Sequence, residues 1–555
     1  MATLEKNKIY RARIEGYSSE GLGIARINGQ VVFVHRAVRG EECDVLVLKV
    51  LKNTAFGKVV SVEKSSEHRQ EPDCPYYGKC GGCDFRHMDY EEELYAKRQR
   101  VQDAITRVGG AAVSVDTIHG AATTERYRNK VQFPVGEGPA IGFYQARTHR
   151  VVDVLDCLLQ PVDAARIRQA VSEYLETYSV PAYDERTGKG LLRHLYVRTN
   201  RAGESLCCLL VNGEKLPHEA ELVEQLRQVV PQLRGVVLGV NRKRNNVILG
   251  DHYRTLWGED YLEETLCGHS FRLSVPSFFQ INRDQTEVLY GRALDFAGLT
   301  GTETVVDLYC GIGTISLTMA EKAGRVIGVE VVPEAIEDAK ENARRNGLAH
   351  KTRFECGDAS QLAAQLEKEG VRPDVVVVDP PRKGLAGDVV ETIARMAPQR
   401  VVYVSCDPAT MGRDVKRFAA LGYAARRAEA VDLFPRTAHV ETVCLLSREK
   451  SVKRYVHVDV TPEELGMRGK SKNVKHPTYP QIREYVKEKH GLTVSSANIA
   501  SVKDECGMEK QFSYKEAGMA AKKRPNCPKK KRDAIVEAFV HFGMLSQSDA
   551  EALDA

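Results

Sequence analysis

One cysteine in the sequence stands where a nucleophile is expected. Residues 401–414, VVYVSCDPATMGRD, begin with a run of β-branched and aromatic residues that ends at Ser405, and Cys406 follows directly. A thiol just beyond a parallel strand lies where open α/β sheets bind their ligands. The dipeptide Asp407-Pro408 is typical of a turn that would hold the thiol in place. Because a lone cysteine is more often an inert packing residue, its role depends on the groups around it.

A methyl-donor site is predicted upstream of this cysteine. The stretch TVVDLYCGIGTISLTMA is typical of a strand, a glycine-rich turn and a helix, and Gly311 and Gly313 would let the backbone approach a ligand closely. The next strand, RVIGVE, ends in Glu330, which can accept hydrogen bonds from ribose hydroxyls. Asp358 and Asp379 follow in FECGDA and DVVVVDPPRKG. This order indicates a class I methyltransferase that uses S-adenosylmethionine, with NAD as the alternative cofactor.

Three further cysteines are closely spaced, in Cys74-x5-Cys80-Gly-Gly-Cys83. The glycines would let the backbone wrap around a centre, so this spacing predicts a metal site. Zinc would need a fourth ligand nearby, and His87 is available. An iron–sulfur cluster would need a fourth thiolate, for which Cys157 is the distant candidate. The spacing is not the CxxxCxxC of radical enzymes, so we expect a structural or RNA-contacting centre.

The composition indicates an ordinary globular protein of several domains. The chain has 555 residues, too many for one core, of which 43% are hydrophobic and 28% charged. No apolar run is long enough to span a membrane and the N-terminus has no hydrophobic signal region, so we expect a cytoplasmic protein, and a monomer. Fourteen cysteines in such a chain favour thiol chemistry or metal binding over disulfides. The tail carries the formal net charge of +5, so any basic groove elsewhere must be local.

Taken together, VSCDPATMGRD, DPPR and HVETV resemble the catalytic motifs of the RNA 5-methyluridine methyltransferases, in the order that this family has them. The resemblance covers about the first 450 residues. It is nearest to the branch that methylates 23S ribosomal RNA and carries a TRAM domain and a 4Fe–4S cluster, and Cys157 matches the fourth cluster ligand of that branch. The resemblance therefore implies S-adenosylmethionine and a 4Fe–4S cluster as cofactors and ribosomal RNA as the partner.

The resemblance also assigns roles to single residues. A Cys406 thiolate would add to carbon 6 of uracil so that carbon 5 accepts the methyl group, and Glu441 would then remove the proton from carbon 5. We therefore expect the site to stabilise Cys406 as its anion. Asp379 would accept a hydrogen bond from the imide of a uridine that is single-stranded or flipped out. The implied donor-binding residues are Gln280, Tyr309, Glu330 and Asp379, and the implied cluster ligands are Cys74, Cys80, Cys83 and Cys157.

Four domains are expected to position these groups. Alternating short strands in residues 1–65 predict a closed OB-like barrel that resembles the TRAM domain. Residues 66–270 are expected to form an α+β domain with the cysteine cluster, and residues 271–450 the class I methyltransferase fold. The cations of the first two domains that could contact phosphate, although each could equally be an ordinary surface charge, are Arg11, Arg13, Arg26, His35, Arg36, Lys52, Arg126, Arg128, Lys130, Arg147, Arg193 and Arg198.

The last domain, residues 451–555, is predicted to be a small helical extension. Helices are expected over 478–491, 495–507 and 533–542, with a basic loop from Lys522 to Arg532 before the third. This pattern suggests an RNA-binding appendage of helix-turn-helix type, with a protein-interaction module or a solvated tail as the alternatives. A helix is also predicted over 89–108, closed by Gly109-Gly110.

Two other functions stay open. Methylation of tRNA uracil would use the same chemistry, although closely matched tRNA members are expected to lack the barrel and the cysteine cluster. A non-catalytic RNA-binding or assembly factor would keep the fold without the activity, but the joint presence of Cys406, Glu441, Asp379 and Gln280 speaks against it. A cytosine methyltransferase would need a PCQ-type motif, which the sequence lacks.

Overall fold

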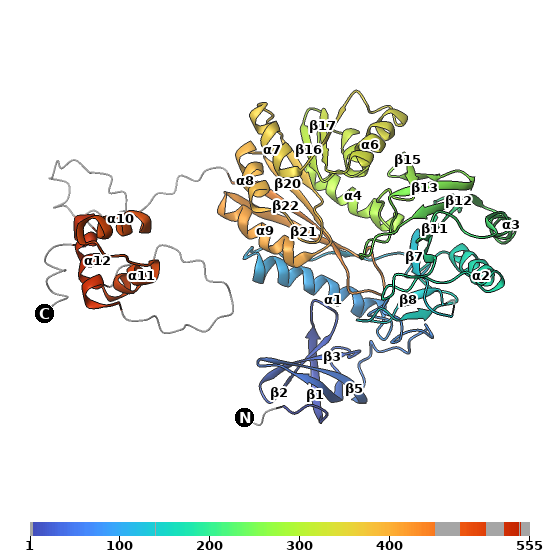
Figure 1. Cartoon of the computed structure of the whole chain (residues 1–555), viewed down its shortest axis with the longest axis horizontal. Helices are drawn as coiled ribbons and strands as arrows, with labels where there is room; N and C mark the ends of the chain where they lie inside the picture. Colours follow the sequence, from blue (N-terminus) through green and yellow to red (C-terminus); the bar gives the residue numbers. More distant parts are fainter. Residues whose placement is uncertain (1–3, 139, 450–477, 507–526, 543, 546–555) are drawn as a thin grey trace. The chain divides into compact units, whose positions relative to one another are not determined.

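The computed structural model contains two compact units, Met1–Lys453 and Arg454–Ala555. It describes residues 4–138, 140–449, 478–506, 527–542 and 544–545. The first unit is built from a barrel, a five-stranded sheet and an eight-stranded sheet (Figure 1). Over the ranges that the structure describes, no helix has the length and apolar character needed to cross a membrane.

The N-terminal barrel closes because its five strands pair in the order β1-β2-β3-β5-β4 and β4 pairs back with β1. Alternate side chains point inward, as in β3, where Val32 and Val34 are fully buried. The predicted closed barrel is therefore confirmed. Its strands are β1 (Ile9–Tyr17), β2 (Gly23–Ile27), β3 (Gln30–His35), β4 (Glu42–Val50) and β5 (Thr54–Lys64).

The helix predicted over 89–108 is confirmed as α1 (Tyr90–Asp103), continued by the π-helical segment η1 (Ala104–Val108). It begins at Asp89, whose carboxylate accepts a hydrogen bond from the Glu92 N–H at 2.9 Å. Both segments pack against α9 (Pro408–Ala420), and β6 (Ile118–His119) pairs with β21 (Tyr423–Val431). This early part of the chain therefore belongs in space to the eight-stranded sheet.

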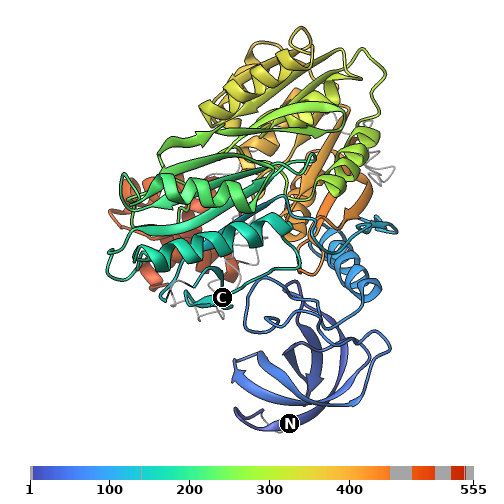
Figure 2. The same cartoon turned by 90° about the vertical axis from the view of Figure 1, so that its right-hand side faces the viewer.

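The central sheet has the strand order β13-β12-β11-β10-β7. Helices α2 (Val162–Thr177) and α3 (Glu219–Val229) lie side by side on one face of it (Figure 2). Because apolar clusters cover both faces, every residue of β10 and β11 is buried. The strands of this region, including the separate β8–β9 hairpin, are β7 (Lys130–Pro134), β8 (Gly142–Tyr144), β9 (Val151–Asp153), β10 (Leu192–Thr199), β11 (Ser205–Val211), β12 (Leu233–Val240) and β13 (His252–Gly258).

The eight-stranded sheet has the order β18-β17-β16-β19-β20-β22-β21-β6, and β22 runs antiparallel between β20 and β21. Residues of α4, α5 and α6 share one buried cluster and residues of α7, α8 and α9 the other. The predicted class I methyltransferase fold is thus confirmed, with helices on both faces of its sheet. Its strands, with the β14–β15 hairpin, are β14 (Tyr261–Leu266), β15 (His269–Ser274), β16 (Thr304–Leu308), β17 (Arg325–Glu330), β18 (Thr352–Cys356), β19 (Val375–Val378), β20 (Arg400–Ser405) and β22 (Glu441–Arg448). Its helices, besides α9, are α4 (Arg283–Ala297), α5 (Thr314–Ala320), α6 (Pro333–Arg345), α7 (Ala359–Lys368) and α8 (Gly387–Met396).

The second unit contains α10 (Tyr479–His490), α11 (Ser496–Glu505) and α12 (Lys529–His541), packed around their own apolar core. Helix α12 begins four residues earlier than predicted, because Pro528 stands at its N-cap and the following residues already continue the helix. The prediction of a loop is therefore wrong for residues 529–532, which form the first turn of α12. Residues 522–526 of the same basic run lie outside the described residues.

Candidate active site

The carboxyl end of strand β20 holds Cys406 in a fixed position. All but the first residue of β20 are buried, and the half-buried Cys406 is the first residue after the strand. Ser405 Oγ accepts a hydrogen bond from the Asp407 N–H at 3.1 Å, and the Asp407 carboxylate caps α9 by accepting from the Ala409 N–H at 2.9 Å. These bonds make the tight turn predicted from Asp407-Pro408 and leave the thiol between a strand end and a helix start.

Two carboxyl groups lie at the same edge. Asp379 directly follows β19, the parallel neighbour of β20. Glu441 is the first residue of β22, whose antiparallel pairing sets Thr442 opposite Ser405. Because β22 starts where β20 ends, the structure brings Glu441, Cys406 and Asp379 together, and each carboxylate acts electrostatically on the thiol.

The electrostatics of the thiol differ from the expectation. Burial, together with the carboxylates of Glu441 and Asp379, raises the pKa of Cys406 to about 11, and Arg382 opposes this rise. The protein groups around Cys406 thus favour the neutral thiol over the anion. The sequence argument was wrong on this point because it did not include the cost of placing an anion beside two acidic side chains.

The two carboxyl groups have raised pKa values as well. Burial and the charge of Asp379 raise the pKa of Glu441 to about 8, and burial raises that of Asp379 to about 6. Glu441 is only 2% exposed. A carboxyl group with a pKa this close to neutrality can both accept and release a proton, which suits a general base.

One cation of the site received no role from the sequence. Arg382, in the DPPR motif, lowers the pKa of both Glu441 and Cys406. Its guanidinium lies 3.5 Å from Nε2 of His439, whose pKa burial lowers to about 4, so His439 is neutral near pH 7. The position of Arg382, three residues after a strand-end Asp379, was a signal that could have identified it.

The methyl-donor residues predicted from the sequence gather at a neighbouring part of this edge. Tyr309 follows β16 in a left-handed conformation with φ of +70°, and its backbone N–H donates to the Val329 carbonyl at 2.9 Å. Glu330 ends the parallel neighbour β17 and accepts a hydrogen bond from the Gly311 N–H at 3.2 Å. The Glu330 carboxylate is thereby held against the glycine-rich turn.

Asp358 and Gln280, also predicted from the sequence, lie outside the contact between Glu330 and the glycine-rich turn. The Asp358 carboxylate caps α7 by accepting hydrogen bonds from the backbone N–H groups of Ser360 and Gln361. Gln280 lies half-buried before α4, and its carbonyl accepts from Asn129 Nδ2 at 2.8 Å, which fixes the loop while the side-chain amide forms no hydrogen bond within the described ranges.

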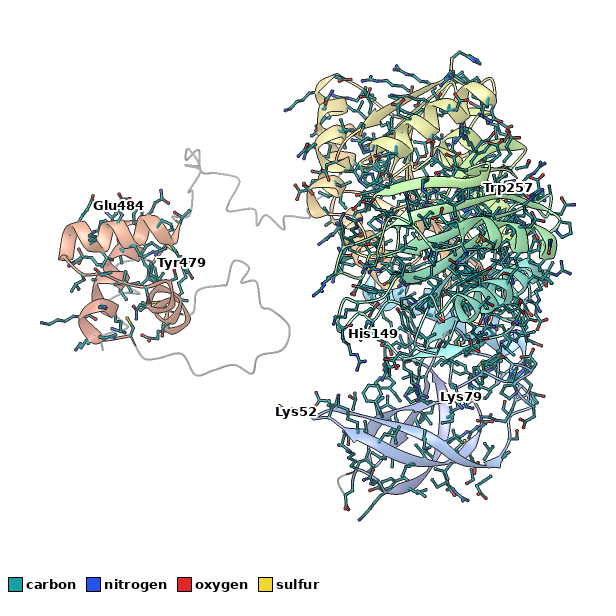
Figure 3. All side chains as sticks on the ribbon, turned by 45° about the vertical axis from the view of Figure 1, so that its right-hand side comes forward. Lys52, Lys79, His149, Trp257, Tyr479 and Glu484 are labelled. Carbon is teal, nitrogen blue, oxygen red and sulfur yellow. The ribbon has the colours of Figure 1, made fainter. Side chains whose placement is uncertain are left out.

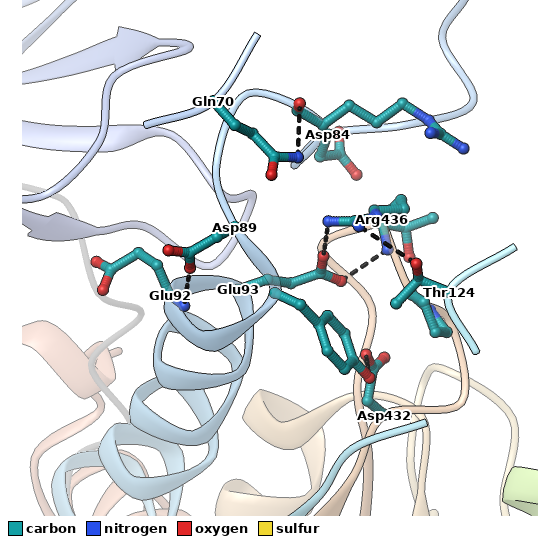
Figure 4. Close-up of polar contacts among 12 residues, drawn as sticks. Gln70, Asp84, Asp89, Glu92, Glu93, Thr124, Asp432 and Arg436 are labelled. Carbon is teal, nitrogen blue, oxygen red and sulfur yellow. Dashed lines mark hydrogen bonds and ion pairs between the residues drawn. The ribbon is translucent and has the colours of Figure 1, made fainter. Parts of the chain in front are cut away.

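The loop that leads into Glu441 is fixed by helix α1 (Figure 4). Lys97, 1% exposed, donates hydrogen bonds of 2.6 Å to Glu93 and to Asp432. Although burial opposes it, Asp432 and Glu93 raise the pKa of Lys97 and keep it charged. The Arg436 N–H donates to the same Glu93 carboxylate at 2.7 Å. Sequence reasoning gave no sign of this network, because Glu93 and Lys97 lie more than 300 positions from their partners Asp432 and Arg436.

The four predicted cluster cysteines surround a single cavity of about 110 Å³. Arg86 and Arg128 line the same cavity, and Nε of each is buried without a hydrogen-bond partner among the described residues. His87 does not line it, and its Nδ1 lies 2.6 Å from the Tyr77 hydroxyl. The cysteines that line the cavity are Cys74, Cys80, Cys83 and Cys157.

Four thiols are the donor set that a four-iron cluster would take. In the part of the chain that is described, no three His, Cys, Asp or Glu side chains are grouped closely enough to hold one ion. A four-iron cluster instead takes one thiolate at each iron, so its ligands are spread around a larger centre. Two guanidinium groups lie beside the thiols, that of Arg86 buried and paired with Asp73 and that of Arg128 half-buried, and they would offset part of the negative charge of such a centre.

Several cations predicted to contact phosphate are instead enclosed by protein. Arg193 and Arg198 are 4% and 2% exposed, and they donate hydrogen bonds to the backbone carbonyls of Asn241 and Ser277. Lys130 is half-buried, and burial lowers its pKa to about 8. The prediction of phosphate contacts is therefore wrong for Arg193 and Arg198, because their guanidinium groups donate hydrogen bonds to backbone carbonyls of the protein.

Comparisons with known proteins agree with this geometry. Residues 218–449 match the family model described as tRNA (Uracil-5-)-methyltransferase, and residues 4–60 match the TRAM domain. An uncharacterized RNA methyltransferase of Halalkalibacterium halodurans is 44% identical over 450 residues, which are 80% of this chain and 98% of the relative. One from Clostridium tetani is 43% identical over 448 residues, again 80% of this chain and 97% of the relative.

A solved structure is similar over most of the chain. The tRNA (uracil-54, C5)-methyltransferase of Pyrococcus abyssi, in complex with S-adenosyl-L-homocysteine, superposes with a TM-score of 0.63 and 25% sequence identity. The match covers 79% of this chain and 100% of that one. The shared fold therefore includes more than the eight-stranded sheet and its helices.

Proposed function

The chain belongs to the RNA uracil-5-methyltransferase family, and from this premise we propose that it transfers a methyl group from S-adenosylmethionine to carbon 5 of a uridine in 23S ribosomal RNA. The observation that carries the proposed chemistry is the meeting of Cys406, Glu441 and Asp379 at one edge of the sheet. A non-catalytic factor would have no need of a thiol and a buried base at the same place.

The first step is nucleophilic addition. The Cys406 thiol loses its proton to water, and the resulting thiolate forms a bond to carbon 6 of the uracil. The electron pair of the double bond between carbons 5 and 6 is displaced and makes carbon 5 nucleophilic. Arg382 is the nearby cation that lowers the pKa of this thiol. Asp379 would accept a hydrogen bond from the ring imide and so orient the base, which has to leave any helix to reach the site.

The second step restores the aromatic ring. Bound S-adenosylmethionine supplies an electrophilic methyl group, with Gln280, Tyr309, Glu330 and Asp379 as the proposed donor-site residues. Once carbon 5 carries the methyl group, ionised Glu441 takes the proton from carbon 5. The C–H electron pair forms the double bond between carbons 5 and 6, and the Cys406 thiolate leaves. Glu441 thus completes a cycle that Cys406 begins.

The four-cysteine cavity is proposed to hold a 4Fe–4S cluster ligated by Cys74, Cys80, Cys83 and Cys157. The cluster would fix the loop around residues 74–87 rather than take part in methyl transfer. Arg86 and Arg128 beside the thiols, each with an Nε that has no hydrogen-bond partner among the described residues, support an anionic occupant of this cavity.

The choice of 23S ribosomal RNA rests on the cysteine set, which resembles that of the ribosomal branch. Methylation of tRNA is the second candidate, and the match to the Pyrococcus abyssi tRNA enzyme favours it. Because that match covers 79% of this chain, the N-terminal domains do not by themselves separate the two substrates. This removes the sequence argument that a tRNA enzyme would lack them.

The two candidates are separated by one experiment. Wild-type protein is incubated with isotope-labelled S-adenosylmethionine and either purified unmodified 23S RNA or unmodified tRNA, and labelled 5-methyluridine is mapped by mass spectrometry. We expect label in 23S RNA, and none in either RNA with Cys406→Ala. Label confined to tRNA would refute the ribosomal assignment, and unimpaired transfer by Cys406→Ala would refute the nucleophile. The half-buried Cys267→Ala serves as the matched cysteine control.

A further inference from the structure

A large second cavity lies on the central domain. Its volume is about 1260 Å³, and its walls include the turn of the β8–β9 hairpin and residues 183–186. None of the proposed catalytic, donor-binding or cluster-ligating residues lines it. Two of its lining residues, Lys79 and His149, lie between the barrel and the central sheet in Figure 3. The hairpin also reaches the barrel directly, since Arg147 lies 3.5 Å from Glu20.

Two buried polar side chains line this cavity with unused hydrogen-bonding groups. Arg193 and His194 are adjacent in β10 and are 4% and 6% exposed. Nε of Arg193 and Nδ1 of His194 have no partner within the described ranges. Burial lowers the pKa of His194 to about 4, so near pH 7 its neutral ring offers one donor and one acceptor nitrogen. Both atoms are covered by the surrounding protein, so a polar ligand would pair with them only after the neighbouring side chains move.

Aromatic rings form part of the same lining. The rings of Tyr144 and His149 lie 5.6 Å apart at the hairpin, and Tyr183 stacks against the Arg193 guanidinium at 4.3 Å on the opposite wall. Flat rings beside hydrogen-bonding edges are the features by which proteins hold unpaired bases. The lining therefore suits a nucleobase better than an aliphatic or a highly charged ligand.

The cavity is lined by paired charges and by two exposed cations without an ion-pair partner among the described residues. Arg186 is paired with Glu137 and Asp184. Lys79 and Arg150, by contrast, are exposed and make no ion pair with any described residue. The rest of the lining has four carboxylates and two arginines, so Lys79 and Arg150 are the two cations left free to meet a phosphate at the rim.

The two walls of the cavity are joined by a weak contact. Glu185 lies 2.8 Å from Nδ1 of His149 and accepts a hydrogen bond of 3.3 Å from the Tyr144 hydroxyl. Both members of the ion pair are well exposed, so water screens it and it adds little stability. The walls can therefore separate at little cost when a ligand enters.

We propose that this cavity receives an unpaired nucleobase of the substrate RNA, from a nucleotide other than the target uridine, with Lys79 and Arg150 holding its phosphate. The inference rests on the proposed function in that it takes RNA as the substrate. It adds a second point of recognition, remote from the reacting thiol, by which the enzyme would choose among uridines in similar loops.

The test measures RNA binding without turnover, using the full chain with Cys406→Ala. Two fluorescent RNAs are compared by anisotropy: a long fragment around the methylated uridine, and a minimal hairpin that carries this uridine alone. Tyr144→Ala should weaken binding of the long fragment about ten-fold through lost stacking. Arg150→Glu should also weaken it and reduce the salt dependence by about one phosphate contact. Lys368→Glu, at the end of α7 and outside the cavity lining, is the charge-matched control.

Each outcome decides the proposal. Selective weakening of the long fragment, with the minimal hairpin and the Lys368→Glu control unchanged, supports it. Equal losses for both RNAs, or no loss for the long fragment, overturn it. His194→Leu adds a buried variant, while the exposed Arg150→Glu keeps the test valid if that variant does not fold. Methyl transfer by wild-type protein tests the proposed function separately, and the long fragment is taken from whichever RNA is methylated, or from both if neither is.

Discussion

Asp84 Oδ2 accepts a hydrogen bond of 2.8 Å from the backbone N–H of Ala438, although the two residues are 354 positions apart. Asp84 directly follows the cysteine Cys83, and Ala438 stands three residues before Glu441. The backbone N–H of Asp84 also donates to the Arg436 carbonyl at 2.9 Å. The cysteine loop is therefore joined to the segment that positions the proposed base.

This bond predicts a selective effect of Asp84→Ala. Loss of one hydrogen bond costs about 0.5–1.5 kcal/mol, so we expect kcat to fall about two- to ten-fold while KM stays within about three-fold and iron content is unchanged. The measurement is steady-state methyl transfer together with iron analysis. Asp116→Ala, an exposed aspartate away from this loop, is the control. An unchanged kcat, or a loss of iron, would contradict a positioning role.

The buried ion network predicts a large stability loss for Lys97→Met. Removing the cation leaves the Glu93 and Asp432 carboxylates buried without compensation, which costs about 3–5 kcal/mol. Urea unfolding of the full chain, followed by far-UV circular dichroism, gives the change. Lys340→Met removes an exposed pair with Glu337 and should cost at most about 1 kcal/mol. Equal losses in the two variants would show that the buried network contributes no special stability.

Glu441→Gln should trap the enzyme on its RNA. The amide has no basic oxygen able to take the proton from carbon 5, so the Cys406–uracil bond forms and the methyl group is transferred, but the thiolate cannot leave. Denaturing gel electrophoresis should show a stoichiometric protein–RNA band that carries the label from S-adenosylmethionine. Glu429→Gln, on the neighbouring strand β21, serves as the control and should release its product. Release of free methylated RNA by Glu441→Gln would assign the base elsewhere.

The release step should accelerate as the pH rises. Burial and Asp379 raise the pKa of Glu441 to about 8, so at lower pH the carboxyl group is protonated and cannot accept the proton of carbon 5. We expect the rate of adduct breakdown to rise about ten-fold per pH unit below 8 and to level off above it. Single-turnover quenching of preformed adduct between pH 6 and 9 measures this rate. A flat profile over that range would mean that Glu441 does not act as the base.

The cysteine cavity predicts iron in the purified protein. Protein prepared without oxygen should be brown, contain about four irons per chain and bleach in air. Cys80→Ser should lower both iron and colour, whereas Cys208→Ser, a buried cysteine of β11, should not. Colourless wild-type protein with stoichiometric zinc would overturn the cluster.

The candidate active site could be predicted from the sequence because each of its reactive groups lies in a local pattern. Cys406, Asp379 and Glu441 each stand at the end or the start of an apolar strand, and strand ends can be recognised from neighbouring residues alone. The closed barrel and helix α1 were predictable for the same reason, since their alternation or periodicity is contained within short segments.

Features that depend on distant partners could not be predicted. Lys97 looks like an ordinary helix cation until the fold places Asp432 beside it. Arg198 looks like a phosphate contact until Ser277 accepts its hydrogen bond in the interior. The raised pKa of Cys406 likewise follows from two carboxylates that reach it from other strands.

The C-terminal unit has an apolar core of its own, whose buried members all lie between Ile482 and Phe539. The last strand of the methyltransferase sheet, β22, ends at Arg448, before this unit begins. The boundary between the two units therefore interrupts no strand of the eight-stranded sheet, and every strand that carries a proposed catalytic group is complete before the C-terminal unit begins.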